Sequence, residues 1–207
     1  MIRLYIARHG ETVWNVQRRM QGQKNSELTD RGRQQAELLS KALEDVELEA
    51  AYSSSSERAL QTSRIIVGDR NIPIVPLDSL REINFGEWEG RNAGDVEKEY
   101  PEQYRNFWEY PLLYEPVGGE SFDDIINRFR AALELLADRH DKGNILVVTH
   151  AVALKTIALI VEKKELKDFW SGTFIHPASL SIIEHDGTGW KAVKWGDISH
   201  YEHERAE

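Results

Sequence analysis

Short apolar runs alternate with longer segments of helical periodicity along this 207-residue chain. The runs at residues 2–7, 50–53 and 145–149 are apolar almost throughout, which is typical of strands buried on both faces of a parallel sheet. The segments between them place apolar residues three or four positions apart, which predicts helices. These helices are expected at residues 29–45, 54–68, 121–140 and 151–161.

Polar residues mark the starts of three of these helices. Thr29 suits an N-cap, and two patterns with serine first and an acidic residue fourth, at residues 54–57 and 121–124, match capping boxes. Near the C-terminus, residues 179–185 and 190–195 predict a hairpin that extends the edge of the sheet. The repeated order of strand and helix predicts an α/β fold with helices on both faces of a mostly parallel sheet.

Length and composition limit the possible classes of protein. With 41% hydrophobic residues the chain can fill one core, so a single domain over residues 1–207 is expected. The absence of cysteine excludes disulfides, a thiolate nucleophile and cysteine-based metal sites. Its first residues lack the basic region and following apolar segment of a secretory leader, and none of its apolar runs is long enough to span a bilayer. We therefore expect a soluble cytoplasmic protein that is a monomer or a homodimer.

The formal net charge of -9 limits the possible binding partners. Nucleic acids and anionic membranes are bound by extended basic patches, so neither is an expected partner. A site for a small anion remains compatible with this charge. It requires a local group of cations that come together from distant parts of the chain.

The most informative polar motif follows the first expected strand. Arg8 and His9 precede Gly10 at the carboxyl edge of the expected sheet, where open α/β folds bind their ligands. Gly10 permits a sharp turn close to a substrate, Arg8 can grip a phosphate with two donors, and neutral His9 has a lone pair that can attack phosphorus. A strand end followed by a capped turn and a surface histidine explains the same residues.

Three further polar residues follow expected strands or extended segments, namely Arg58, Glu82 and His150. Phosphoryl transfer through His9 would need fixed positive charge, for which Arg8, Arg58 and His150 are candidates. It would also need a proton donor that later acts as a base, for which Glu82 is the candidate. Plainer interpretations are a surface Glu82 paired with a neighbouring arginine, an exposed Arg58 on its helix, and His150 as a packed core imidazole.

Ordered motifs run through nearly the whole chain. They are Arg8-His9-Gly10-Glu11-Thr12 with Trp14-Asn15, Leu28-Thr29-Asp30-Arg31-Gly32 with Gln35-Ala36, Ser53 with Arg58-Ala59 and Thr62, Leu80-Arg81-Glu82, Phe85-Gly86 with Trp88-Glu89-Gly90, Gly119-Glu120-Ser121, and Val148-Thr149-His150. In this order and spacing the chain resembles the histidine phosphatase superfamily, the phosphoglycerate mutase-like enzymes. It looks closest to the broad-specificity phosphatase branch.

The resemblance implies a three-layer α/β/α sandwich, with His9 as the phosphorylated nucleophile and Glu82 as the proton donor. The phosphate ligands that it implies are Arg8, Asn15, Gln21, Gly22, Arg58 and His150. A backbone contact from Ala151 would complete the site, although many members have glycine there. Positive charge comes from arginine and histidine, and no acidic or histidine cluster has the spacing of a metal site, so we expect neither a metal nor a cofactor.

Residues 83–120 bear on the choice between two activities. This segment holds nine acidic and three basic residues, a balance that repels polyanionic sugars and disfavours a 2,3-bisphosphoglycerate-dependent phosphoglycerate mutase. The aromatic residues within 100–114 predict either a lid-like insert over a bulky substrate or ordinary core packing. We expect hydrolysis of a small-molecule phosphate ester. The alternatives are the mutase and a phospholigand-binding module without turnover.

Overall fold

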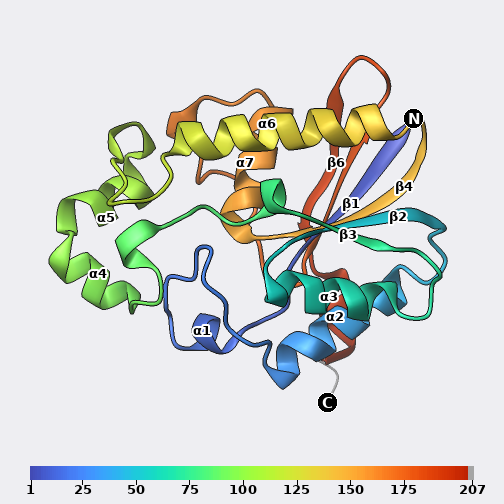
Figure 1. Cartoon of the computed structure of the whole chain (residues 1–207), viewed down its shortest axis with the longest axis horizontal. Coiled ribbons are helices and arrows are strands. Elements are labelled where there is room, and N and C mark those ends of the chain that lie inside the picture. Colours follow the sequence, from blue (N-terminus) through green and yellow to red (C-terminus); the bar gives the residue numbers. More distant parts are fainter. Residues whose placement is uncertain (205–207) are drawn as a thin grey trace.

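The computed structural model describes residues 1–204 and contains a six-stranded sheet with the order β3-β2-β4-β1-β5-β6 (Figure 1). The strands that pair in parallel are β1 Ile2–Arg8, β2 Leu48–Ser54, β3 Ile74–Leu77 and β4 Gly143–Thr149. The antiparallel hairpin at the other edge consists of β5 Leu180–His185 and β6 Trp190–Asp197. The expected mostly parallel sheet with an edge hairpin is confirmed, and β3 is a strand that the apolar pattern does not predict.

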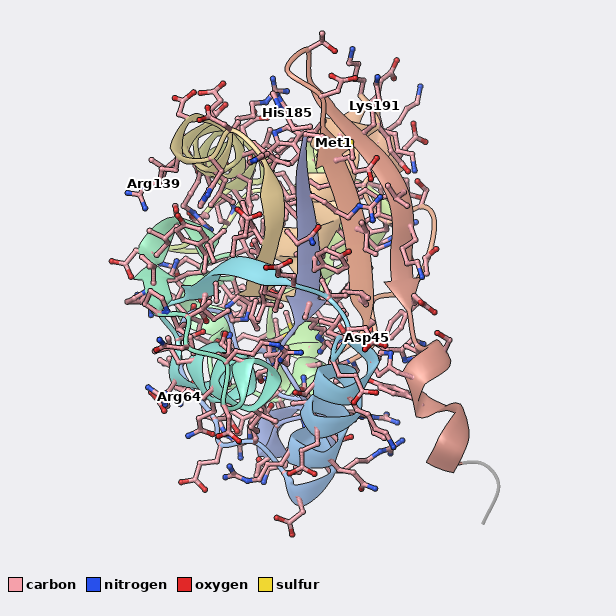
Figure 2. All side chains as sticks on the ribbon, turned by 90° about the vertical axis from the view of Figure 1, so that its right-hand side faces the viewer. Met1, Asp45, Arg64, Arg139, His185 and Lys191 are labelled. Atoms are coloured by element: carbon pink, nitrogen blue, oxygen red, sulfur yellow. The ribbon has the colours of Figure 1, made fainter. Side chains whose placement is uncertain are left out.

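Helices cover both faces of the sheet (Figures 1 and 2). One face carries α2 Asp30–Ala42 and α3 Glu57–Val67, and the other carries α6 Phe122–Arg139 and α7 Ala151–Val161. The remaining α-helices are α1 Val13–Val16, α4 Ala93–Glu99 and α5 Pro101–Glu109. Across residues 1–204, no helix has both the length and the apolar stretch that a bilayer crossing requires.

The side chains of β1 show how one strand serves two cores. Successive residues of a strand point to opposite faces. Leu4 and Ile6 therefore join the core beneath α6 and α7, whereas Tyr5 and Ala7 join the core beneath α2 and α3. Two cores separated by one sheet confirm the three-layer α/β/α sandwich.

The register of the sheet brings two strand ends together. Arg8, the last residue of β1, is paired with Thr149, the last residue of β4. His9 and His150 therefore leave adjacent strands at the same level, on the carboxyl edge of the parallel part of the sheet. This edge is the place where ligands bind in open α/β folds.

The expected helix starts are confirmed at two positions and wrong at a third. Thr29 caps α2 by accepting the Gly32 N–H, and Ser121 forms a reciprocal capping box at α6. The capping box at residues 54–57 does not form, because α3 starts after Ser56 and that residue makes no side-chain cap hydrogen bond. The hydroxyl groups of Ser54 and Ser56 are instead directed at His150.

The segment 83–120 stands beside the sheet and carries α4 and α5 (Figure 1). Its inner aromatic rings are packed against one another and against α6, with Trp88 and Phe107 fully buried and Tyr114 7% exposed. Core packing therefore accounts for these rings. The outer side chains of the segment, among them Trp108 and Leu112, are exposed.

Candidate active site

His9 lies at the carboxyl end of β1 and is 3% exposed. Its Nδ1 atom is 2.7 Å from the carbonyl oxygen of Gly10, so Nδ1 carries the proton and donates it. The Nε2 atom therefore keeps a lone pair, as a nucleophilic imidazole must. Burial, followed by the charges of Arg58 and Arg8, holds the pKa of His9 well below its usual range, which keeps the ring neutral at neutral pH.

His150 lies at the end of β4 and is fully buried, with its ring centroid 5.2 Å from that of His9. Its Nδ1 accepts a hydrogen bond from Arg58 Nη2 at 3.1 Å, so the proton of the neutral ring is on Nε2. Nε2 faces the hydroxyl oxygens of Ser54 at 2.8 Å and Ser56 at 3.1 Å. Burial and the Arg58 charge lower the pKa of His150 well below its usual range. The two histidines are thus held in opposite tautomers.

Arg58 lies in the first turn of α3 and is 1% exposed. Its Nη1 and Nη2 groups donate to the carbonyl oxygens of Lys24 and Gly22, each at 2.7 Å. Its Nε is buried and has no hydrogen-bond partner among the described residues. Burial lowers the pKa of Arg58 to about 10, against the opposing effect of the Glu82 charge, so the side chain remains a cation. An exposed Arg58 is ruled out.

Arg8 is also held by a backbone carbonyl group. Its Nη1 donates to the carbonyl oxygen of Ile175 at 2.7 Å, and its buried Nε has no partner within the described part of the chain. Burial lowers the pKa of Arg8, and the Glu82 charge opposes this effect. Two guanidinium groups, each with a buried and unsatisfied Nε–H, are chemically suited to the oxygens of an anion.

Glu82 is 7% exposed and caps α7. Its carboxylate accepts the backbone N–H groups of Val152 and Ala153, each at 3.1 Å, and that of Ile83 at 2.9 Å. Burial raises the pKa of Glu82, while the hydrogen bonds from Ile83 and Val152 and the charge of Arg58 partly offset the rise. The surface interpretation of Glu82 is therefore wrong.

The structure brings the other expected site residues to this edge to different degrees. Gly22 contacts Arg58 through its carbonyl group, and Ala151 is the first residue of α7, directly after His150. Asn15 uses its Oδ1 to close a capping box at α1. Gln21 is 8% exposed, and its buried Oε1 has no partner among the described residues. Within residues 1–204, Asn15 and Gln21 make no side-chain hydrogen bond to the other expected site residues.

Glu89 organises the loop that holds Arg58, and sequence reasoning did not single it out. Its carboxylate accepts the backbone N–H groups of Gln23 at 2.7 Å, Lys24 at 3.1 Å and Phe85 at 3.2 Å. A Cβ atom on Gly22, where φ is +53°, would lie 2.2 Å from Glu89 Oε1. Only glycine fits this close approach. The available signal was the Trp-Glu-Gly motif at residues 88–90.

The described residues contain no group of three His, Cys, Asp or Glu side chains placed to hold a metal ion. The cations of the site are guanidinium groups, which neutralise phosphate oxygens without a metal. The arrangement therefore suits transfer of a phosphoryl group to an imidazole nitrogen by an α/β enzyme.

Comparison with known proteins agrees with that class. The chain belongs to the histidine phosphatase superfamily, branch 1, whose family model matches residues 4–198, and it is an enzyme of that superfamily. It is 34% identical over 171 residues to phosphoserine phosphatase 1 of Hydrogenobacter thermophilus, covering 83% of this chain and 81% of the relative. The metal-independent phosphoserine phosphatase of Arabidopsis thaliana is 32% identical over 200 residues, which are 95% of this chain and 82% of the relative.

A solved structure is also closely similar. YhfR of Bacillus stearothermophilus has a TM-score of 0.94 and 44% sequence identity to this chain. The match covers 97% of this chain and 99% of that one. The likeness therefore extends over the whole sandwich, including the segment 83–120.

Proposed function

We propose that this enzyme hydrolyses small-molecule phosphomonoesters through a phosphohistidine intermediate on His9. One observation carries the proposal. A neutral imidazole with a free Nε2 lone pair lies within electrostatic reach of Arg8 and Arg58, whose buried Nε–H donors are unsatisfied within the described residues. The phosphatase names of the two relatives support hydrolysis as the outcome.

In the first step, His9 Nε2 attacks phosphorus, an N–P bond forms and the P–O bond to the leaving alcohol breaks. Arg8 and Arg58 donate hydrogen bonds to the phosphoryl oxygens as charge spreads over them. Glu82 in its acid form gives its proton to the leaving oxygen, for which a raised pKa is required at neutral pH. The Asn15, Gln21, Gly22 and Ala151 groups complete the phosphate cradle in this proposal, together with His150.

In the second step, water attacks the phosphorus of phosphohistidine. The Glu82 carboxylate takes a proton from this water, the N–P bond breaks, and His9 Nε2 regains its lone pair. Inorganic phosphate then leaves, and Glu82 is again an acid. Glu82 thus acts as an acid in the first step and as a base in the second, and the two steps need no further cofactor.

The charges of the insert 83–120 favour hydrolysis over the mutase reaction. Two of its basic residues are engaged in ion pairs, Arg91 with Glu99 and Arg105 with Glu109. Few free cations therefore remain there to hold a second phosphate or a carboxylate. A phospholigand-binding module without turnover is disfavoured because binding alone does not require a buried proton donor such as Glu82.

Several further expectations belong to this proposal. Metal independence is supported by the guanidinium donors and by the name of the Arabidopsis relative. A cytoplasmic location is in keeping with the absence of cysteine. A lid-like role of residues 83–120 and a monomeric or homodimeric state stay predictions.

The intermediate provides the direct test of this function. Brief incubation with a radiolabelled phosphomonoester, followed by a denaturing quench, should leave acid-labile and base-stable phosphate on the enzyme. The variant His9→Ala should carry no such label and lose turnover. A matched control is His185→Ala, since His185 lies at the opposite end of the sheet (Figure 2). Full turnover by folded His9→Ala contradicts the mechanism.

A parallel assay separates the activities. The purified enzyme is given alcohol phosphates and, separately, 3-phosphoglycerate with 2,3-bisphosphoglycerate. We expect release of inorganic phosphate to dominate over isomerisation. Isomerisation faster than phosphate release would replace the phosphatase assignment with the mutase.

A further inference from the structure

An exposed aromatic pair lies on the loop that leads into β5. Phe174 is 67% exposed, although it is a large apolar side chain. Its ring meets the ring of His176 edge to face, with centroids 4.7 Å apart. Ile175, between them, is 4% exposed and belongs to the core. The two rings therefore share the outer side of the loop, while the residue between them anchors it.

The loop is tied directly to the phosphate-binding edge. The carbonyl oxygen of Ile175 accepts the hydrogen bond from Arg8 Nη1 at 2.7 Å, and Ala178 donates its N–H to the carbonyl oxygen of His9 at 3.1 Å. The charge of Arg8, after burial, contributes to lowering the pKa of His176. Phe174 and His176 thus flank the residue whose carbonyl group fixes Arg8.

The aromatic residues of the insert do not offer an equivalent surface near the phosphate. Trp88, Phe107 and Tyr114 are closed into a ring cluster. A substrate cannot reach those rings without opening the core. Among the described residues, the exposed rings of Trp108 and Tyr110 make no hydrogen bond or ring contact to Arg8, Phe174 or His176, and the ring of Trp108 packs on that of Trp170 instead.

We propose that Phe174 and His176 form a platform for the leaving group, and that the enzyme favours phosphomonoesters of flat, apolar alcohols such as phenols and naphthols. This inference rests on the proposed function, because the phosphate must first be held by Arg8. An aryl group attached to that phosphate can stack on the pair and remove the exposed surface of Phe174 from water. A small polar leaving group, such as the serine side chain, gains nothing from this surface.

The experiment compares two substrates across one set of variants. Steady-state kinetics are measured with 2-naphthyl phosphate and with O-phosphoserine, and inorganic phosphate is used as a competitive inhibitor that probes the phosphate subsite alone. For Phe174→Ala we expect KM for 2-naphthyl phosphate to rise about tenfold, which corresponds to the loss of one aromatic contact with its buried area. KM for phosphoserine and the inhibition constant of phosphate should change by less than about twofold.

Two further variants complete the set. Phe174→Tyr should restore most of the affinity for 2-naphthyl phosphate, since the ring is kept. Leu112→Ala is the matched control, because Leu112 is 68% exposed on the insert and has no part in the proposed platform. Since Phe174 is mostly exposed, its replacement should leave the melting temperature nearly unchanged.

The outcomes distinguish this inference from the function on which it rests. If Phe174→Ala weakens the binding of both substrates and of inorganic phosphate equally, the pair acts on Arg8 rather than on the leaving group, and the platform is refuted. If Leu112→Ala has the larger effect on 2-naphthyl phosphate, the insert binds the aryl group instead and the platform is refuted. If the wild-type enzyme turns over no phosphomonoester, the proposed function itself fails.

Discussion

The two imidazoles at the site have equivalent positions in the sequence but different chemistry in the structure. Both follow a strand of the parallel sheet, so position does not say which is the nucleophile. His9 donates from Nδ1 to Gly10, which leaves Nε2 free, whereas the His150 Nδ1 lone pair is occupied by Arg58. The hydrogen-bond partners, which are the adjacent Gly10 for His9 and the distant Arg58 for His150, thus favour His9 for the reacting role.

The raised pKa of Glu82 leads to a prediction about the leaving group. Replacing it in Glu82→Gln should lower kcat/KM for an alkyl phosphate by roughly 100-fold or more, because a poor leaving group needs the proton. The loss for nitrophenyl phosphate should be less than about tenfold, because nitrophenolate departs with little protonation. Kinetics with both esters check this, and equal losses would remove Glu82 from the acid role.

The pH profile of the same reaction has a definite sign. Burial raises the pKa of Glu82, so its acid form persists to higher pH than that of an ordinary glutamate. As pH rises through that pKa, the acid is lost and kcat with an alkyl phosphate should fall. Glu82→Gln should lack this alkaline limb. If kcat of the variant still falls at alkaline pH, the decrease is due to the titration of a group other than Glu82.

The lowered pKa of His9 predicts a stability effect. Below the ordinary histidine pKa of about 6.5, this histidine binds a proton in the unfolded chain but stays neutral in the folded protein. The free energy of unfolding should therefore decrease as the pH is lowered, by up to about 1.4 kcal/mol per pH unit for His9. Urea unfolding of wild type and His9→Asn over about pH 7.5 to 5.5 tests this. The variant should show the shallower dependence, and His185→Asn serves as the control. Parallel curves for wild type and His9→Asn would contradict the assignment.

Among the elements, the loop of residues 22–24 shows how one carboxylate shapes a cation site. Glu89 holds the backbone of Gln23 and Lys24, and the carbonyl groups of this loop hold Arg58. In the proposed mechanism the carboxylate therefore acts on the phosphate through Arg58, as a positioning residue.

We predict a corresponding effect on kinetics. In Glu89→Gln an amide N–H₂ group must face backbone N–H donors, which should displace the loop and Arg58. A displacement of about 1 Å lowers kcat/KM by roughly 100-fold, and the affinity for inorganic phosphate should fall in parallel. Glu87→Gln is the matched control, since within residues 1–204 the one hydrogen bond made by the Glu87 carboxylate is that accepted from the Tyr100 hydroxyl at 2.7 Å. Weakened catalysis with unchanged phosphate affinity would rule out an effect through Arg58.

The elements also show what the sequence could predict. The strands at residues 2–7 and 145–149 were predictable because both faces are buried, which demands apolar residues throughout. The capping box at residues 54–57 was a false signal, because His150 takes the serine hydroxyl groups. The clamp by Glu89 was not predictable, since it depends on backbone N–H groups more than sixty residues away.

At the scale of the whole molecule, a chain of net charge -9 concentrates cations at one sheet edge. The three-layer order could be predicted from the alternation of strands and helices, but the placement of α4 and α5 depends on ring packing that has no simple period. Similarly, the burial of Glu82 and Arg58 could not be predicted from the composition, since charged residues are mostly exposed.

The arginine-based site predicts insensitivity to chelators. Because Arg8 and Arg58 supply the positive charge in the proposed mechanism, incubation with EDTA followed by assay in metal-free buffer should leave kcat within about twofold of the untreated value. Loss of activity that a divalent cation restores would show that a metal takes part. The same assay on a metal-dependent phosphatase verifies that the treatment removes metal.

Because Glu82 caps α7, a change in its protonation state during the proposed catalytic cycle should change the rigidity of that helix. A charged carboxylate binds backbone N–H groups more strongly than a neutral acid does. The first turn of this helix should then be stiffest between the two half-reactions, while phosphorus is bonded to nitrogen, and should relax once water has reprotonated the carboxyl group. In the proposed cycle the protonation state of Glu82 therefore sets the rigidity of the first turn of α7, which begins next to His150.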